Sequence, residues 1–151
     1  MNRKQGKSND VNATKNRVGM KAAQTLLAQW GFYKIECVDG GGKGCDFEAS
    51  RNDKRYKIEL KTTATTGVPD AFENEFEDLE DFPTLKADYL LVVRVEKDKA
   101  GGFSPLRGNL VSKEEVDSYK ERHRVVKHVK FSRKFQSDLY TGKIGDWKNY
   151  Q

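Results

Sequence analysis

The amino-acid sequence predicts one domain of the α/β class, and three stretches carry that prediction. Apolar residues recur at helical spacing over residues 16–30. Apolar and charged residues alternate over 44–63, as they do in half-buried strands. Residues 88–96, DYLLVVRVE, are almost continuously apolar, which is typical of a central strand buried on both faces. A chain of 151 residues suits one such core.

The first elements follow from these patterns. Residues 1–15 are polar and basic, and we expect a flexible arm that tracks phosphates; an ordinary frayed terminus is the alternative. Residues 16–151 show no internal repeat and no second boundary, so we expect them to form a single domain. Its first helix, 16–30, has Asn16 as a cap and Gly31 after its end. A strand over 32–38 and a glycine-rich turn over 38–44 follow.

The second half of the chain alternates in the same way. Phenylalanine and leucine spacing over 70–81 predicts a helix whose acidic residues form a solvated face. Glycine and proline predict a loop over 97–109. Ser112 and Glu115 match a capping box at the start of a second long helix. A strand over 125–131 and a basic, aromatic tail complete the chain; the tail either stacks on nucleic acid or packs back onto the domain.

The composition predicts a modest core under a heavily charged surface. Hydrophobic residues make up 36% of the chain and charged residues 34%, and the formal net charge is +5. Positive charge favours a polyanionic partner, nucleic acid before a membrane, although a basic protein without such a partner is the alternative. No apolar run is long enough to span a bilayer, and the polar N-terminus lacks the apolar segment of a signal peptide. We therefore expect a cytoplasmic protein without a membrane partner.

The two cysteines, Cys37 and Cys45, are too few for a disulfide framework. We expect reduced thiols, with Cys37 buried on the apolar face of a strand. A zinc site would need His123 and His128 as further ligands, and this spacing fits no standard zinc finger.

The stretch 44–63, GCDFEASRNDKRYKIELKTT, holds the candidate chemical groups. It is typical of two strands joined by a polar turn across 50–54. Asp46 lies in the first strand, and Glu59 and Lys61 lie two residues apart in the second, so they share a face. Paired as a hairpin, the strands would bring two carboxylates and an ammonium group together. A solvated polar face without chemistry is the alternative interpretation.

These groups match the requirements of metal-dependent phosphodiester hydrolysis. Mg²⁺ prefers carboxylate and water oxygens, so Asp46 and Glu59 are candidate ligands, with the backbone carbonyl of Leu60 as a third and Mn²⁺ as an alternative ion. The metal would activate a water molecule and shield the charge of the phosphate. Lys61 would stabilise the negative charge that develops during hydrolysis.

The order of elements around the motif resembles the PD-(D/E)xK nuclease superfamily, which includes restriction endonucleases and archaeal-type Holliday-junction resolvases. The matching residues are Asp46 in GCDFEA, and Glu59 and Lys61 in YKIELKTT; the resemblance covers residues 16–96. It implies a restriction-endonuclease-like fold, a mixed β-sheet core flanked by helices in the order αβββαβ. It also implies that Asp46 and Glu59 bind the metal and that Lys61 is the catalytic lysine.

The sequence departs from the family pattern at two positions. Resolvase-like relatives often carry a glutamate on the first helix, where this chain has Met20, with Gln24 one turn further on. Cys45 stands before Asp46, where a proline is the nominal residue. The missing helix carboxylate argues against a second metal and against resolvase function specifically.

The sequence therefore predicts a Mg²⁺-dependent endonuclease that hydrolyses DNA, with a homodimer as one option. The candidate DNA contacts are Arg17, Lys21, Lys57, Thr62 and Thr63, of which the two threonines begin an expected loop beyond Lys61. Two alternatives stay open: a module of the same fold that binds nucleic acid without cleaving it, and a protein-interaction factor that uses the acidic segment 70–81.

Overall fold

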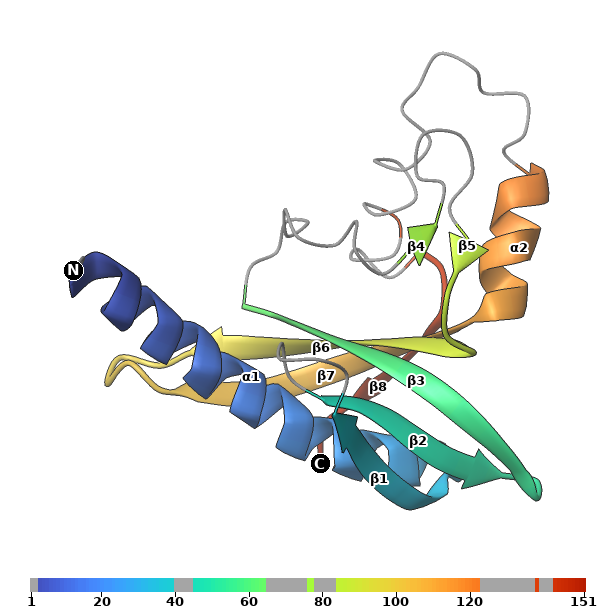
Figure 1. The fold of residues 1–151 in the computed structure, drawn as a ribbon, viewed down its shortest axis with the longest axis horizontal. Helices are drawn as coiled ribbons and strands as arrows, with labels where there is room; N and C mark the ends of the chain where they lie inside the picture. Colours follow the sequence, from blue (N-terminus) through green and yellow to red (C-terminus); the bar gives the residue numbers. More distant parts are fainter. Residues whose placement is uncertain (1–2, 40–44, 65–75, 78–83, 123–137, 139–142) are drawn as a thin grey trace.

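The protein folds as a six-stranded sheet with two helices, in a computed structural model that describes residues 3–39, 45–64, 76–77, 84–122, 138 and 143–151 (Figure 1). The strand order is β1-β2-β3-β6-β7-β8, and β4 and β5 form a separate short pair. The expected α/β class is confirmed. The elements are α1 (Arg3–Gln29), β1 (Tyr33–Asp39), β2 (Cys45–Arg51), β3 (Lys54–Thr63), β4 (Phe76–Glu77), β5 (Thr84–Leu85), β6 (Tyr89–Lys97), β7 (Phe103–Ser112), α2 (Lys113–Arg122) and β8 (Asp146–Asn149).

The six-stranded sheet is mixed. Strands β1, β2 and β3 form an antiparallel meander, and β6, β7 and β8 form a second one. The two meanders join through β3 and β6, which run parallel. A parallel pair requires a crossover connection between its strands, and residues 64–88 make that connection here.

Helix α1 covers one face of the sheet and forms the main core with it. Ala22, Ala23, Leu26 and Leu27 recur on one side of the helix and are fully or almost fully buried. They pack against sheet residues that alternate along their strands, since successive strand side chains point to opposite faces: Phe47, Ala49, Ile58, Leu91, Val93, Val95 and Leu110. We call this side of the sheet the α1 face.

Helix α1 begins earlier than the sequence pattern predicts. Apolar periodicity starts near residue 16, but the helix runs from Arg3 and so covers most of the segment expected as a basic arm. Residues 3–15 contain no proline to interrupt a helix, and they lack the apolar stripe on which the prediction was based.

Strand β6 is the central strand that its apolar run predicted. It lies between β3 and β7, and Leu90, Leu91, Val92 and Val93 each have 0% of their surface exposed. Leu91 and Val93 face α1, whereas Leu90 and Val92 face the opposite side. We call that opposite side the site face.

Helix α2 starts at the predicted capping box. The amide nitrogen of Glu115 donates to Ser112 Oγ at 3.1 Å, and the amide nitrogen of Ser112 donates to Glu115 Oε1 at 3.2 Å. Val116 and Tyr119, three residues apart on one side of the helix, are buried. The helix stands beside the short β4–β5 pair, away from α1 (Figure 1). His123 lies outside the described residues.

The expected loop over 97–109 is wrong for most of its length. Only residues 98–102 connect β6 to β7, and the turn is held by Asp98, whose Oδ1 accepts hydrogen bonds from the amides of Ala100 and Gly102. The proline and glycine that indicated a loop fit into β7 for separate reasons. Pro105 lies at a break in the β6–β7 register, and Gly108 makes room for the Leu26 side chain of α1.

Other expectations for the second half are tested only in part. Phe76 and Glu77 form β4 instead of part of a helix, and the remainder of 70–81 lies outside the described residues, as does the expected strand 125–131. The tail packs back onto the domain at β8, which pairs with β7. Trp30 Nε1 at the end of α1 donates to Asp146 Oδ2 at 2.7 Å and so fixes the start of β8.

The cysteines correct the expectation of buried, reduced thiols. Cys37 is exposed and takes part in a disulfide bond. The sequence has one other cysteine, Cys45, whose side chain lies outside the described part. The register pairs Asp39 with Cys45 and Phe47 with Cys37, so the backbones of the two cysteine positions lie close together on neighbouring strands. Residue counts alone do not reveal such a register.

Candidate active site

The candidate site is built on the hairpin of β2 and β3. A two-residue turn joins the strands, and its residues Asn52 and Asp53 both have positive φ, 54° and 62°, which this tight type of hairpin requires. From the turn the register runs to the pair of Phe47 and Ile58. The pairing of β2 with β3 ends there. Asp46 and Glu59, the two predicted metal ligands, stand one residue beyond this last pair, one on each strand.

The burial of the hairpin fixes which side these residues face. Phe47 and Ile58 are fully buried on the α1 face. The intervening positions therefore lie on the site face, because strand side chains alternate. On β3 these residues are Lys57, Glu59, Lys61 and Thr63.

Glu59 and Lys61 stand at the border of an apolar surface. In the parallel pairing with β6, Glu59 lies beside Leu90, and Lys61 lies beside Val92. Both β6 side chains are fully buried, and both charged residues are partly buried. The two charged side chains thus share one face of β3 on a partly desolvated surface, where electrostatic interactions are stronger than in bulk water.

The predicted donor set suits a hard divalent cation. Asp46 and Glu59 would offer carboxylate oxygens, the ligands that Mg²⁺ prefers. The side chain of Asp46 lies outside the described part. Among the side chains that the structure does describe, no group of three or more histidine, cysteine, aspartate or glutamate residues is placed to hold a metal. Leu60 packs its side chain on the α1 face, so only its backbone carbonyl is available to the site.

The predicted DNA contacts separate into two groups. Lys57 is exposed on the site face, and its amide donates to Asp88 Oδ2 at 2.8 Å. Arg17 and Lys21 are exposed on α1, which packs on the opposite face of the sheet. Of this predicted set, only Lys57 combines an exposed side chain with a position on the face of Glu59 and Lys61.

The two threonines differ from their expected place. Thr62 and Thr63 belong to β3 and not to a loop, and their exposed fractions are 8% and 2%. Thr62 lies on the α1 face against Gly19, on the opposite side from Glu59. Thr63 is on the site face, beside Arg94 of β6. Alternation continues through both residues, which is why they extend the strand.

Met20, at the helix position where the sequence lacks a carboxylate, also has apolar surroundings. It is partly buried and packs against the core under α1, and Gln24 is exposed. The helix thus contributes packing at this position.

Three residues share the site face in an arrangement that the sequence did not indicate. Arg94 on β6 lies opposite Arg107 on β7, and Trp147 on β8 lies opposite Asn109 of β7. The only signal for them was strand alternation, and it became readable once β7 and β8 were known to be strands.

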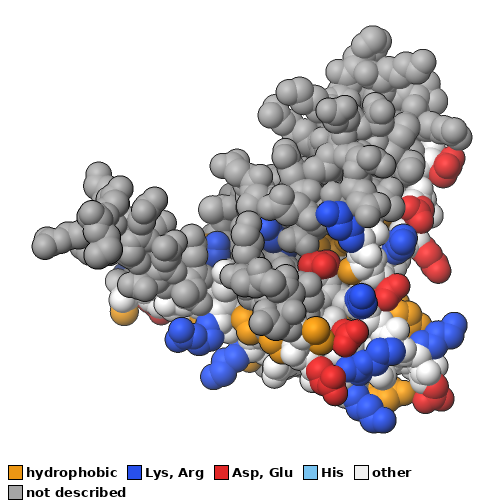
Figure 2. All heavy atoms as spheres, viewed as in Figure 1, with side chains coloured by type: hydrophobic (Ala, Val, Ile, Leu, Met, Phe, Trp, Pro, Cys, Tyr) orange, Lys and Arg blue, Asp and Glu red, His pale blue; other side chains and the backbone are white. Residues whose placement is uncertain are grey.

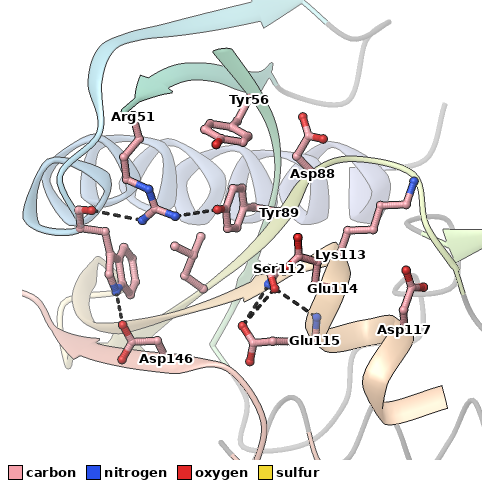
Figure 3. A pocket seen from close by; sticks show the side chains of 12 residues that line it. Arg51, Tyr56, Asp88, Tyr89, Ser112, Lys113, Glu114, Glu115, Asp117 and Asp146 are labelled. Carbon is pink, nitrogen blue, oxygen red and sulfur yellow. Dashed lines mark hydrogen bonds between the residues drawn. The ribbon is translucent and has the colours of Figure 1, made fainter. Parts of the chain in front are cut away.

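A cavity of about 510 Å³ opens elsewhere, where α1 ends and α2 begins (Figure 3). Arg51 crosses it, donating to the carbonyl oxygen of Trp30 and to Tyr89 Oη. The rim carries five acidic side chains: Asp88, Glu114, Glu115, Asp117 and Asp146. Neither Glu59 nor Lys61 lines it, so the cavity is distinct from the site on the hairpin, and its acidic rim does not suit a polyanion.

Surface charge around the hairpin is mixed. Figure 2 shows lysine and arginine side chains beside aspartate and glutamate side chains over the part of the molecule formed by β2 and β3.

Neither described helix is long and apolar enough to cross a membrane. No protein-family model matches the chain, and neither a curated protein nor a solved structure matches it.

Proposed function

We propose that the chain is a Mg²⁺-dependent DNA endonuclease with its active site on β2 and β3. One observation carries the proposal: Asp46 and Glu59 stand one residue beyond the last pair of the hairpin, Phe47 and Ile58, and Lys61 is on the same face as Glu59. The strand order supports it, because an antiparallel meander that continues into a parallel strand is compatible with a restriction-endonuclease-like core.

Each group has a distinct role in this proposal. Asp46 and Glu59 hold the ion, with the carbonyl of Leu60 as a further ligand, and the ion supplies charge neutralisation at the phosphate. Lys61 donates hydrogen bonds to the phosphate and balances the negative charge that grows during hydrolysis. The buried Leu90 and Val92 beside them exclude water from one side and strengthen these interactions.

The test compares variants on several DNA forms. Duplex, branched and single-stranded DNA are incubated with Mg²⁺ or Mn²⁺ and wild-type protein, Asp46→Ala, Glu59→Ala or Lys61→Ala. We expect cleavage by the wild type only. Glu48→Ala, on the same face of β2, and Lys54→Ala, at the far end of β3, are matched controls that keep activity. Equal activity in the wild type and all three site variants, or no cleavage of any DNA by the wild type, would contradict the proposal.

The second candidate is a module that binds nucleic acid without cutting it, which the apolar setting of Met20 favours. Salt-dependent DNA binding with neither metal binding nor cleavage would favour this function over the endonuclease.

Whether the chain forms a homodimer is measured separately, by light scattering in solution.

A further inference from the structure

Two arginines and a tryptophan form a group on the site face, next to the proposed active site. Arg94 of β6 lies between Thr63 of β3 and Arg107 of β7 in the register. Trp147 of β8 lies on the same face, because it opposes Asn109, two residues along β7 from Arg107. We call Arg94, Arg107 and Trp147 the Arg–Trp group.

The guanidinium groups of both arginines lie over the Trp147 ring. The Cζ atom of Arg107 is 4.5 Å from the ring centroid, and that of Arg94 is 5.7 Å from it. Both distances are within the range of a cation–π interaction. Stacking orients a planar guanidinium while its N–H groups stay available to bind a phosphate in a bidentate manner.

The two arginines differ in their access to solvent. Arg107 is exposed, and no described residue forms an ion pair with it. Arg94 is 7% exposed, so Arg107 is the arginine of the group that solvent reaches.

The position of the group relates it to the proposed active site. Lys61 pairs with Val92 of β6, and Arg94 lies two residues further along β6 on the same face. Arg94 in turn pairs with Arg107 of the next strand, β7. Neighbouring strands lie roughly 4.8 Å apart, so β7 is about 10 Å from β3. Successive phosphates of a nucleic-acid strand are spaced closely enough for one at Lys61 and a nearby one at Arg107 to belong to the same strand.

We propose that Arg107, held on Trp147, binds the sugar-phosphate backbone of the DNA strand whose scissile phosphate lies at Lys61. Arg107 makes the contact, and Trp147 and Arg94 act as positioning residues. The inference takes its substrate class from the proposed function, but it does not require cleavage. Attachment of β8 to the sheet is the competing role for the same stacking, so the experiment must separate binding from folding.

The experiment measures binding of a short fluorescent DNA duplex in EDTA, by anisotropy, at about 50–200 mM salt. The proteins are wild type, Arg107→Gln, Arg107→Lys and Lys148→Gln. Lys148 is the matched control: it lies on β8, but its ammonium group is over Trp30 on the opposite face. All three variants are first checked for a wild-type thermal midpoint.

We expect Arg107→Gln to weaken binding at least about threefold and to reduce the slope of log affinity against log salt by about 0.9, the value of one lost phosphate contact. Lys148→Gln loses the same charge and should leave the slope unchanged. Arg107→Lys keeps the charge and therefore the slope, with affinity between the two. If Arg107→Gln is too unstable to measure, Arg107→Lys decides, since a purely structural arginine would leave its affinity at the wild-type value.

The result separates this inference from the proposed function. Equal affinity and slope in Arg107→Gln and Lys148→Gln overturn the inference even if the wild type cleaves DNA. A wild type that binds no duplex without metal also overturns it. Conversely, a selective loss of binding in Arg107→Gln by a protein that never cleaves DNA supports the inference and contradicts the endonuclease.

Discussion

Gly19 of α1 and Thr62 of β3 lie in direct contact, and a Cβ atom placed on Gly19 would meet the Thr62 Cγ2 atom at 2.7 Å. Only glycine lets the helix approach the strand this closely. The contact matters for the candidate site, since Thr62 directly follows Lys61 on β3. The position of α1 on the sheet is therefore set next to the strand that carries Glu59 and Lys61.

Replacing Gly19 by alanine should destabilise the protein. The added methyl group overpacks the contact, which typically lowers the free energy of unfolding by about 1–3 kcal/mol. Alanine favours a helix more than glycine by roughly 1 kcal/mol, so a net loss can arise only from the tertiary contact. Urea unfolding measures it, with Gln24→Ala on the exposed side of α1 as the control, expected within about 0.5 kcal/mol of the wild type.

A second change tests the cause of that loss. Thr62→Ala in the Gly19→Ala background removes the atoms that the new methyl group would strike, so it should restore part of the stability. If Thr62→Ala changes the stability of the wild type and of Gly19→Ala by the same amount, the helix can shift on the sheet without a penalty, and the close approach does not position β3.

The hydrophobic pattern predicted the helices and strands whose buried positions recur at a regular spacing or form a continuous run. The apolar stripe of α1, the alternation in β2 and β3, and the apolar run of β6 each reflect burial on a defined side. The start of α1 and the identity of β7 were missed for local reasons. Polar helix turns have no stripe to detect, and Pro105 and Gly108 indicate a loop until their places at a register break and under Leu26 are known.

The pairing of strands that lie far apart in the chain could not be predicted from the sequence. The hairpin of β2 and β3 follows from a turn that is local in the sequence, so alternation was sufficient to predict it. The pairing of Arg94 with Arg107, and the stacking of both on Trp147, depend on the order β6-β7-β8. No local pattern encodes that order, because it is set by which strands bury each other's faces.

Arg51 should be a major determinant of stability at the end of the core. Its Cζ atom lies 4.3 Å from the Phe32 ring centroid and 5.2 Å from that of Tyr89, and its guanidinium donates to Trp30 O at 3.2 Å. Arg51→Ala removes the stacking and leaves a carbonyl group without its donor, which should lower the free energy of unfolding by about 2–3 kcal/mol. Denaturant unfolding monitored by circular dichroism measures this change.

Arg55→Ala is the matched control for Arg51. Arg55 is exposed on the neighbouring strand, where it pairs with Glu36 at 3.0 Å, and surface ion pairs contribute about 0–1 kcal/mol. Arg51→Lys separates charge from geometry, because lysine lacks the planar fork. If Arg51→Ala and Arg55→Ala lose the same stability, the stacking on Phe32 and Tyr89 contributes little.

The disulfide of Cys37 should stabilise the native chain. A bond between cysteines this close in the sequence closes a short loop, which limits the unfolded chain and adds about 2–3 kcal/mol to the free energy of unfolding. Cys37→Ser should lose that amount, and a reductant should lower the stability of the wild type while leaving the variant unchanged. Oxidised wild-type protein that still reacts fully with a thiol reagent would show that the bond does not form in solution.

Divalent metal should raise the thermal stability of the wild type through Glu59. A ligand that binds only the native state stabilises it by about 2.7 kcal/mol at a hundredfold excess over its dissociation constant, a midpoint increase of roughly 5–10 °C for a chain of this size. Mn²⁺ or Mg²⁺ should produce this increase, and EDTA should remove it. Glu59→Gln, which keeps the size of the side chain but removes its charge, should unfold at one temperature with or without metal. Glu48→Gln changes the same chemistry on the same face of the hairpin, opposite Lys57, and should respond as the wild type does. Equal metal-induced increases in the two variants would place the ion away from Glu59 and contradict the proposed active site.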